Sequence, residues 1–140
     1  MTDRLTREQR SWNMSRIPSK DTSAERSVRS LLHRMGYRFR LNRRDLPGSP
    51  DIVLPKYSTV IFVHGCFWHR HTDCRLAYTP RTRTDFWMKK FTDNVARDAT
   101  VTRKLRDAGW HVLTVWECEL AAPDRLASRL HHALSAWAPR

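Results

Sequence analysis

All three cysteines of the sequence stand where a metal site needs them. Cys66, His71 and Cys74 lie within nine residues, and Cys118 follows a later apolar segment. Zinc favours a set of three thiolates and one imidazole, because its filled d shell accepts a tetrahedron of sulfur and nitrogen donors. Four protein ligands leave no position for an activated water, so we predict a structural zinc site. Two alternatives stay open: His69 in place of His71, or Cys118 as a buried core thiol.

A carboxylate and two imidazoles lie at the ends of two other apolar segments. Asp51 opens one segment after Pro50, and the next segment ends at Val63 and His64. Mg²⁺ prefers hard oxygen ligands, so a carboxylate at a strand end and a main-chain carbonyl of the neighbouring strand can hold it. His64 and His69 have ordinary pKa values near neutrality, so either is a candidate for proton transfer. The pattern predicts acid–base chemistry beside a magnesium ion.

The carboxylates also have structural interpretations. Asp51 follows a proline and could be only a turn residue. Asp98, in the middle of a predicted helix, could orient an imidazole or could pair with Arg97 or Lys104 on a solvated face. Glu25 has the N3 spacing of a capping box at the start of a helix.

The charge of the chain favours a polyanionic partner. Its 140 residues include 26 Lys and Arg against 14 Asp and Glu, which gives a formal net charge of +12. Such an excess attracts nucleic acid and releases counterions as phosphates are neutralised. A merely soluble basic surface is the alternative. No segment approaches the roughly 20 apolar residues of a membrane span, and no long amphipathic basic helix indicates a membrane surface.

Three large aromatic residues accompany the basic segment. Phe67 and Trp68 lie among the metal-binding residues, and Trp87 begins a long predicted helix. Flat side chains in a polar, basic segment are poor core candidates, and insertion between DNA bases would explain them. A mismatched step opens more easily than a paired one, so such a wedge would select deformable sites. Core packing is the alternative, above all for Trp87.

The hydrophobic pattern predicts the elements that position these residues. A helix begins at Thr22 and ends at Gly36, and a long helix covers residues 84–108. Strands are predicted over residues 37–41, 51–54, 59–63 and 110–116, and a last helix opens near Pro123. The order of helix, three strands, helix, strand and helix predicts an α/β fold, a mixed sheet flanked by helices.

Burial follows from the same pattern. We expect the two later helices to bury apolar stripes, made of Phe91, Val95 and Leu105 in one and of Leu126, Leu130, Leu134 and Trp137 in the other. The length predicts a single domain over residues 1–140, in which residues 1–20 form a polar arm or short helix. The first ten residues lack the apolar core of a signal peptide, so we expect a cytoplasmic protein with reduced thiols.

Short motifs follow one another along the chain. One is Val63-His64-Gly65-Cys66-Phe67-Trp68-His69, with Pro50-Asp51 before it. Others are Asn13-Met14, Asp21-Thr22, Thr82-Arg83-Thr84, Phe86-Trp87, Asn94-Val95, Arg97-Asp98 and Val115-Trp116-Glu117-Cys118. Together they run from about residue 10 to residue 120. In content and order they resemble the very-short-patch repair (Vsr) DNA mismatch endonucleases, which implies a fold related to type II restriction endonucleases.

The resemblance implies an activity and a cofactor. The enzyme would need Mg²⁺ and would nick double-stranded DNA on the 5′ side of the T in a T:G mismatch, which arises when 5-methylcytosine is deaminated. Asp51 and the carbonyl of Val63 would hold the metal. Some relatives carry Thr where this chain has Val63, a change that a carbonyl ligand tolerates.

The resemblance also implies catalytic roles. His69 would be the general base, with Asp98 behind it, and the fold would carry a histidine where related restriction enzymes usually place a lysine. His64 and Glu25 would complete the site near the scissile phosphate. The segment between His69 and Cys74 varies in length within the family, so the assignment of His71 depends mainly on its spacing.

DNA contacts follow from the same resemblance. Phe67, Trp68 and Trp87 would enter the DNA from the major groove. Met14 and Ile17 would lie in the minor groove.

Partners and competing functions complete the sequence-based picture. We expect a monomer, because no further apolar helix face is available for a dimer, and a nucleoid-associated enzyme with mismatch-repair proteins as partners. A restriction-type nuclease that cuts both strands is one alternative. A non-catalytic zinc module that only binds DNA is another, and it leaves Asp51, His64 and His69 unexplained.

Overall fold

The computed structural model describes residues 23–41 and 43–137. The predicted N-terminal arm lies outside this part of the chain, as do Met14 and Ile17, the predicted minor-groove residues. None of the described helices is long and apolar enough to cross a membrane.

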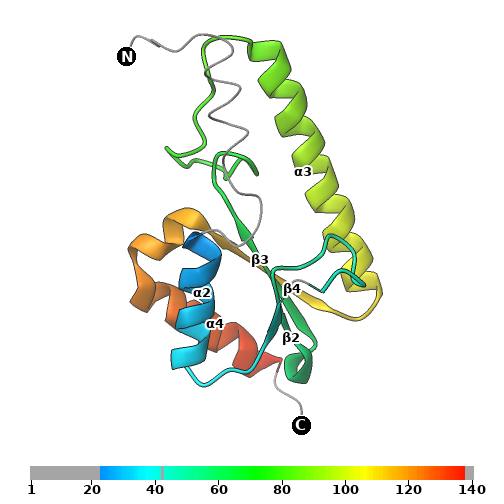
Figure 1. Cartoon of the computed structure of the whole chain (residues 1–140), viewed down its shortest axis with the longest axis vertical. Helices are drawn as coiled ribbons and strands as arrows, with labels where there is room; N and C mark the ends of the chain where they lie inside the picture. The colour runs from blue at the N-terminus through cyan, green and yellow to red at the C-terminus, as the bar shows by residue number, and fades with distance from the viewer. Residues whose placement is uncertain (1–22, 42, 138–140) are drawn as a thin grey trace.

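A four-stranded mixed sheet lies at the centre of the molecule (Figure 1). Its strands, in spatial order, are β1 (Arg40–Leu41), β2 (Ile52–Leu54), β3 (Thr59–His64) and β4 (His111–Trp116). β2 is antiparallel to both β1 and β3, whereas β3 and β4 are parallel. Parallel neighbours need a crossover connection, and a long loop and helix provide it in this fold. The predicted mixed sheet is confirmed.

Helices cover both faces of this sheet. α2 (Ser23–Arg34) and α4 (Pro123–Ala136) lie together on one side, and α3 (Thr84–Asp107) lies on the other (Figure 1). Two short 3₁₀ helices complete the chain, η1 (Pro55–Tyr57) between β2 and β3 and η2 (Glu117–Ala121) after β4. The predicted order of elements is therefore confirmed as well.

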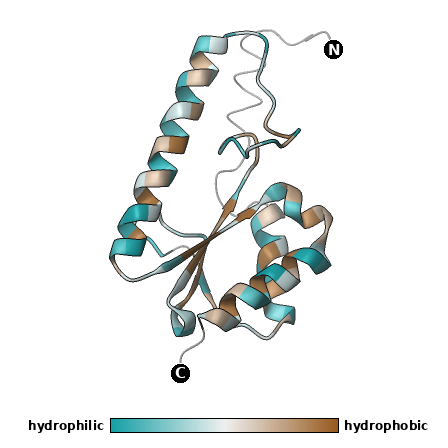
Figure 2. Ribbon diagram, turned by 180° about the vertical axis from the view of Figure 1, so that it is seen from behind, coloured by the Kyte–Doolittle hydropathy of each residue, from teal (hydrophilic) through white to brown (hydrophobic). Residues whose placement is uncertain are grey.

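Alternating residues of the strands build two cores. The core under α2 and α4 takes from the sheet Ile52, Leu54, Ile61, Leu113 and Val115. The smaller core on the α3 side is made of Val53, Val60, Phe62 and Leu105. A strand that is buried on both faces must be apolar throughout, which explains why β2 and most of β3 are continuous apolar runs (Figure 2).

The long helix α3 extends beyond the sheet. Its 24 residues span about 36 Å at 1.5 Å per residue, whereas the six residues of β4 span about 20 Å. Leu105 packs on the sheet, and Phe91 is buried farther along the helix. Val95 is 46% exposed, so its predicted place on the inner face is wrong. It lies where the helix has left the sheet, and it lines a cavity instead.

Two further expectations need correction. The strand predicted over residues 37–41 is only two residues long, and Tyr37 and Phe39 pack as partly buried residues on the core of α2 and α4. Leu126, Leu130 and Leu134 of α4 are buried as predicted. Trp137 follows the end of α4 and is only partly buried, with its ring stacked on His111 at 4.3 Å.

Candidate active site and metal centre

The chemistry-bearing residues gather where β3 and β4 end. His64 and Trp116 are partners in the register of these parallel strands. Cys66 and Cys118 both follow two residues later, one in the loop after β3 and the other in η2. Parallel strands end at the same edge of a sheet, so the strand register brings together two cysteines that are 52 positions apart (118 − 66).

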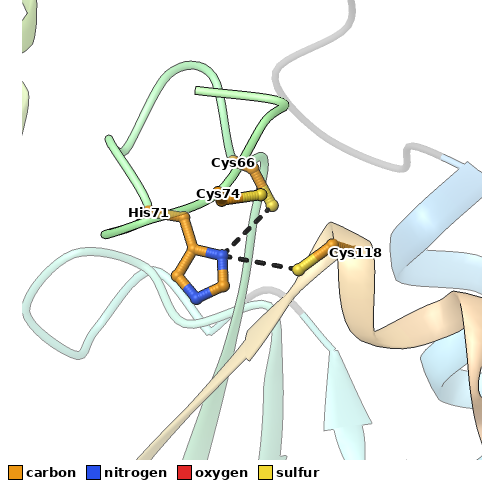
Figure 3. Close-up of side chains that lie close together, drawn as sticks. All are labelled: Cys66, His71, Cys74 and Cys118. Carbon is orange, nitrogen blue, oxygen red and sulfur yellow. Dashed lines mark hydrogen bonds between the residues drawn. The ribbon is translucent and has the colours of Figure 1, made fainter. Parts of the chain in front are cut away.

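Four of these residues form a compact donor cluster, which we call the metal cluster. It consists of Cys66, His71, Cys74 and Cys118, and their ligand atoms all lie within 4.8 Å of one another (Figure 3). His71 Nδ1 is 3.6 Å from Cys66 Sγ and 3.4 Å from Cys118 Sγ. A tetrahedral zinc with bonds of about 2.3 Å to sulfur and about 2.0 Å to nitrogen separates such atoms by about 3.5 Å. The cluster could thus bind a metal ion such as zinc.

The thiols of this cluster have shifted pKa values. Burial raises the pKa of Cys66 to about 12 and also raises the pKa of Cys118. The backbone N–H of Leu76 lowers the pKa of Cys74. Metal ions bind the thiolate form, so a cation must displace protons from Cys66 and Cys118 as it enters.

A second cluster, which we call the imidazole pair, contains His64 and His69 with Asp98. The two rings are stacked, with centroids 3.8 Å apart and planes 6° from parallel. His69 Nδ1–H donates a hydrogen bond of 2.7 Å to Asp98 Oδ2. An ionised carboxylate only accepts, so the lone pair of His69 remains on Nε2. Asp98 thus contacts the imidazole, and His69 lies in this cluster while His71 lies among the cysteines.

The environment of His64 differs from that of His69. Burial, and next the neighbouring His69, lower the pKa of His64 to about 4. Its Nδ1 is buried and has no hydrogen-bond partner within the described segments. With that pKa His64 is a poor base at neutral pH, and His69 stays the candidate for proton transfer.

Two buried carboxylates line the same cavity as the imidazole pair. The cavity has a volume of about 800 Å³ and opens between α2, the ends of the strands and α3. Asp51 is 9% exposed, and its Oδ2 accepts a 2.8 Å hydrogen bond from the backbone N–H of Val63. Glu25 is 2% exposed and lies 3.4 Å from Arg29 on the next turn of α2. The capping residue Thr22, proposed as its partner, lies outside the described residues.

The aromatic residues pack against one another beside this cavity. Phe67 lies 5.1 Å from Trp68, 5.8 Å from Trp87 and 5.2 Å from Phe91, as measured between ring centroids. Trp87 is 5% exposed, which corrects the expectation that it is a poor core candidate. Phe67 and Trp68 are partly exposed and line the cavity.

Two residues hold this loop in place: Arg70, which sequence reasoning did not single out, and Asn94, which it gave only as part of the Asn94-Val95 motif. Arg70 donates to the carbonyl of Tyr78 at 2.9 Å, and its guanidinium lies 4.0 Å above the Phe91 ring. Asn94 Nδ2 donates to the carbonyl of Trp68 at 3.2 Å. Asn94 lies one helical turn before Asp98, so one face of α3 contacts two adjacent loop residues. The four-residue spacing of Asn94 and Asp98 was the sequence signal that could have placed them on one face of the helix.

The sequence is similar to those of several known proteins. The family model for DNA mismatch endonuclease Vsr matches residues 2–76, a stretch that holds Asp51, both histidines of the imidazole pair and three residues of the metal cluster. The type II nicking enzyme V.XorIIP of Xanthomonas oryzae pv. oryzae is 51% identical over 96% of this chain and 98% of its own length. The DNA mismatch endonuclease Vsr of Escherichia coli is 44% identical, over 98% of this chain and 88% of that protein. The type II nicking enzyme V.HpaIIP of Haemophilus parainfluenzae is 33% identical over 94% and 95%. The chain therefore belongs to the Vsr family of DNA mismatch endonucleases.

Proposed function

We propose that this endonuclease nicks duplex DNA on the 5′ side of the T in a T:G mismatch, in a reaction that needs Mg²⁺ and uses His69 as general base. The observation that carries the proposal is the hydrogen bond of His69 to Asp98, in a cavity that also holds Asp51. A carboxylate behind an imidazole fixes the tautomer that a general base needs.

The chain's own residues supply the proton transfer. His69 Nε2 takes a proton from the attacking water, whose oxygen forms a new bond to phosphorus as the bond to the leaving oxygen breaks. The leaving oxygen takes up a proton from solvent, so atoms and charges balance. Asp98 stabilises the imidazolium that forms on His69. The His64 ring stacks on the His69 ring and keeps the His69 imidazole in the cavity.

The donors that would hold Mg²⁺ are Asp51 and the carbonyl of Val63. Bound there, the metal would supply charge stabilisation at the phosphate. The residues fit this ion, because Asp51 is a hard oxygen donor held against β3 by the Val63 N–H. Glu25 and His64 line the same cavity and complete the site near the scissile phosphate.

The metal cluster, in this proposal, holds a structural zinc. It uses all three cysteines of the chain, and the cavity that contains Asp51 lies outside it. Its four donors would fix residues 66–74, a segment with little apolar content of its own. Metal analysis of purified protein tests this assignment. About one zinc per chain should survive dialysis and be lost in Cys118→Ser, and well-folded protein without zinc would contradict it.

Selection of the mismatch is assigned to Phe67 and Trp68, and the buried Trp87 packs behind their rings as a support. Partial exposure of Phe67 and Trp68 at the cavity supports an entry from the major groove, because their rings can stack on bases without unfolding the loop. Met14 and Ile17 stay proposed minor-groove contacts. One monomer suffices for this reaction, since a nick needs one site.

Nicking and binding assays with two substitutions test the catalytic assignment. Asp51→Asn and His69→Gln should lower the nicking rate by about a thousandfold or more and should leave DNA affinity in EDTA within about twofold. His132→Gln, at an exposed position of α4, is the matched control. Nicking at the wild-type rate by either variant would overturn the proposed roles of Asp51 and His69.

A further inference from the structure

Trp116, the last residue of β4, lies between the metal cluster and the imidazole pair. Its ring stacks on His71, with centroids 4.2 Å apart and planes 10° from parallel. It also meets the ring of His64 edge to face, at 5.3 Å and 73°. In the described part of the chain, no other aromatic ring contacts an imidazole of each cluster.

These contacts continue to the proposed base. His64 stacks on His69 at 3.8 Å, and His69 is bonded to Asp98. A line of ring contacts thus runs from a donor of the metal cluster, through Trp116 and His64, to His69. Packed chains of side chains of this kind can transmit the orientation of one group to another.

The imidazole pair needs such support. The buried Nδ1 of His64 has no hydrogen-bond partner among the described residues, so packing sets the orientation of this ring. The hydrogen bond from the His69 side chain to Asp98 fixes one ring atom but permits the ring to tilt about it. Stacking on His64 removes that freedom, provided that His64 itself is held.

Trp116 is itself rigidly placed. Its backbone N–H donates to Glu119 Oε1 at 3.0 Å, and Glu119 accepts two hydrogen bonds from Arg129 at 2.8 and 2.9 Å. Arg129 also donates to the carbonyl of Thr114 at 2.8 Å. The backbone on either side of Trp116 is therefore tied together, and the indole itself is held between the rings of His71 and His64.

We propose that Trp116 is a positioning residue for the nicking reaction. It transfers the fixed orientation of His71 in the metal cluster to His64, and through His64 it holds the His69 imidazole in its reactive position. This inference rests on the proposed role of His69. It gives the metal cluster a part in catalysis, although the cluster takes no part in the chemistry itself.

Three variants test the proposal. Trp116→Leu removes the ring, and Trp116→Phe keeps a smaller one. Trp110→Leu is the matched control, because Trp110 packs with the core on the α3 side and is absent from the ring contacts and donors of both clusters. For each variant we would measure zinc content, thermal unfolding, affinity for mismatched duplex and single-turnover nicking in Mg²⁺. We would also follow the NMR signal of the His69 Nδ1 proton, since His69 makes no ring contact with Trp116 in the structure.

The expected pattern separates positioning from stability. Trp116→Leu should keep about one zinc and the wild-type DNA affinity, while its nicking rate falls about tenfold or more, because small displacements of a reacting group are costly. Its His69 Nδ1 proton should exchange faster with solvent than in wild type. The nicking rate and the proton exchange of Trp116→Phe should lie between those of Trp116→Leu and wild type. Trp110→Leu should nick at the wild-type rate.

Two outcomes would overturn the proposal. One is a Trp116→Leu protein that nicks as fast as Trp110→Leu with an unchanged His69 signal. The other is a loss of rate that only follows a loss of zinc or of fold. If Trp116→Leu does not fold, Trp116→Phe decides: a wild-type rate and signal there would contradict positioning. The His69 signal tests positioning even if the enzyme proves not to act on T:G, so failure of the proposed function is distinguishable.

Discussion

His69 shares its Nδ1 proton with Asp98 over 2.7 Å, and this leaves Nε2 as the basic nitrogen. In the proposed mechanism the Asp98 carboxylate acts through geometry and charge, since it would select one tautomer of His69 and stabilise the imidazolium that forms. Histidine is suited to this task because its ordinary pKa lies close to neutral pH. The sequence was enough to nominate His69 and Asp98 as site residues. It could not predict their contact, because Arg97 and Lys104 were also potential partners of Asp98.

Asp98→Asn removes the charge while keeping the size of the side chain. The amide can present its N–H₂ to His69 and so favour the wrong tautomer, and we expect the nicking rate to fall by about 10²–10⁴-fold with little change in DNA affinity. Asp107→Asn is the control, because it removes the same charge from the same helix without touching an imidazole. Equal rates for the two variants would show that Asp98 has no positioning role.

The tryptophans of the proposed wedge differ in exposure. Trp87 is 5% exposed and is surrounded by rings of Phe67, Trp68 and Phe91. The sequence left core packing open as the alternative for Trp87, because these partners come from a loop and a helix that are joined only by the fold. Trp68 is the better test of base stacking, since it is partly exposed at the cavity.

Trp68→Ala should lower the rate on T:G duplex about tenfold or more, because each base contact with an aromatic ring contributes ~1–3 kcal/mol. Its salt dependence of binding should match that of wild type, because no charge is removed. Trp87→Ala should instead lower the free energy of unfolding by about 3–5 kcal/mol. If Trp68→Ala lowers the nicking rate and the affinity equally on matched and mismatched DNA, a wedge role for Trp68 is excluded.

Most elements could be predicted, because their apolar spacing is local information. The buried runs of β2 and β3, the long helix and the last helix all follow from it. Two features depended on distant parts of the chain. β1 is short because only Arg40 and Leu41 reach a partner in β2. Val95 is exposed, whereas Phe91, one turn earlier in α3, is buried among the rings of Phe67 and Trp87.

The loop before Asp51 packs tightly on α3. Gly48 has φ +73, and a Cβ there would lie 2.5 Å from Val101 Cγ1. Gly48→Ala should therefore combine left-handed strain with overpacking, and should lower the free energy of unfolding by about 2–4 kcal/mol in urea titrations.

Gly109→Ala is the matched control for this prediction, because φ is +94 but nothing lies within 4 Å of its added Cβ. It should show the strain alone, about 1 kcal/mol. Adding Val101→Ala to Gly48→Ala should restore part of the lost free energy of unfolding, because it removes the clashing methyl groups. If the two glycine variants are equally unstable, the contact with Val101 has no energetic weight.

At the scale of the whole molecule, one end of the sheet brings together two clusters whose residues come from three separate segments of the chain. Strand register places a metal cluster beside an acid–base pair, and α3 closes the cavity over both carboxylates and aromatic rings. The α/β architecture agrees with the restriction-endonuclease-like fold that the Vsr family implies. The net charge of +12 provides attraction to phosphates along any DNA, so the proposed function leaves discrimination of the mismatch to the cavity and its rings.

Strand-resolved cleavage of matched and mismatched duplexes is the decisive test of mismatch nicking. Duplexes of one sequence would carry T:G, C:G or T:A at a single position, with each strand labelled separately, in Mg²⁺ or in EDTA. We expect one nick, on the 5′ side of the T in the T:G duplex, that requires Mg²⁺ and leaves the G strand intact. Cutting of both strands, equal cleavage of the matched duplexes or cleavage in EDTA would contradict the proposed function.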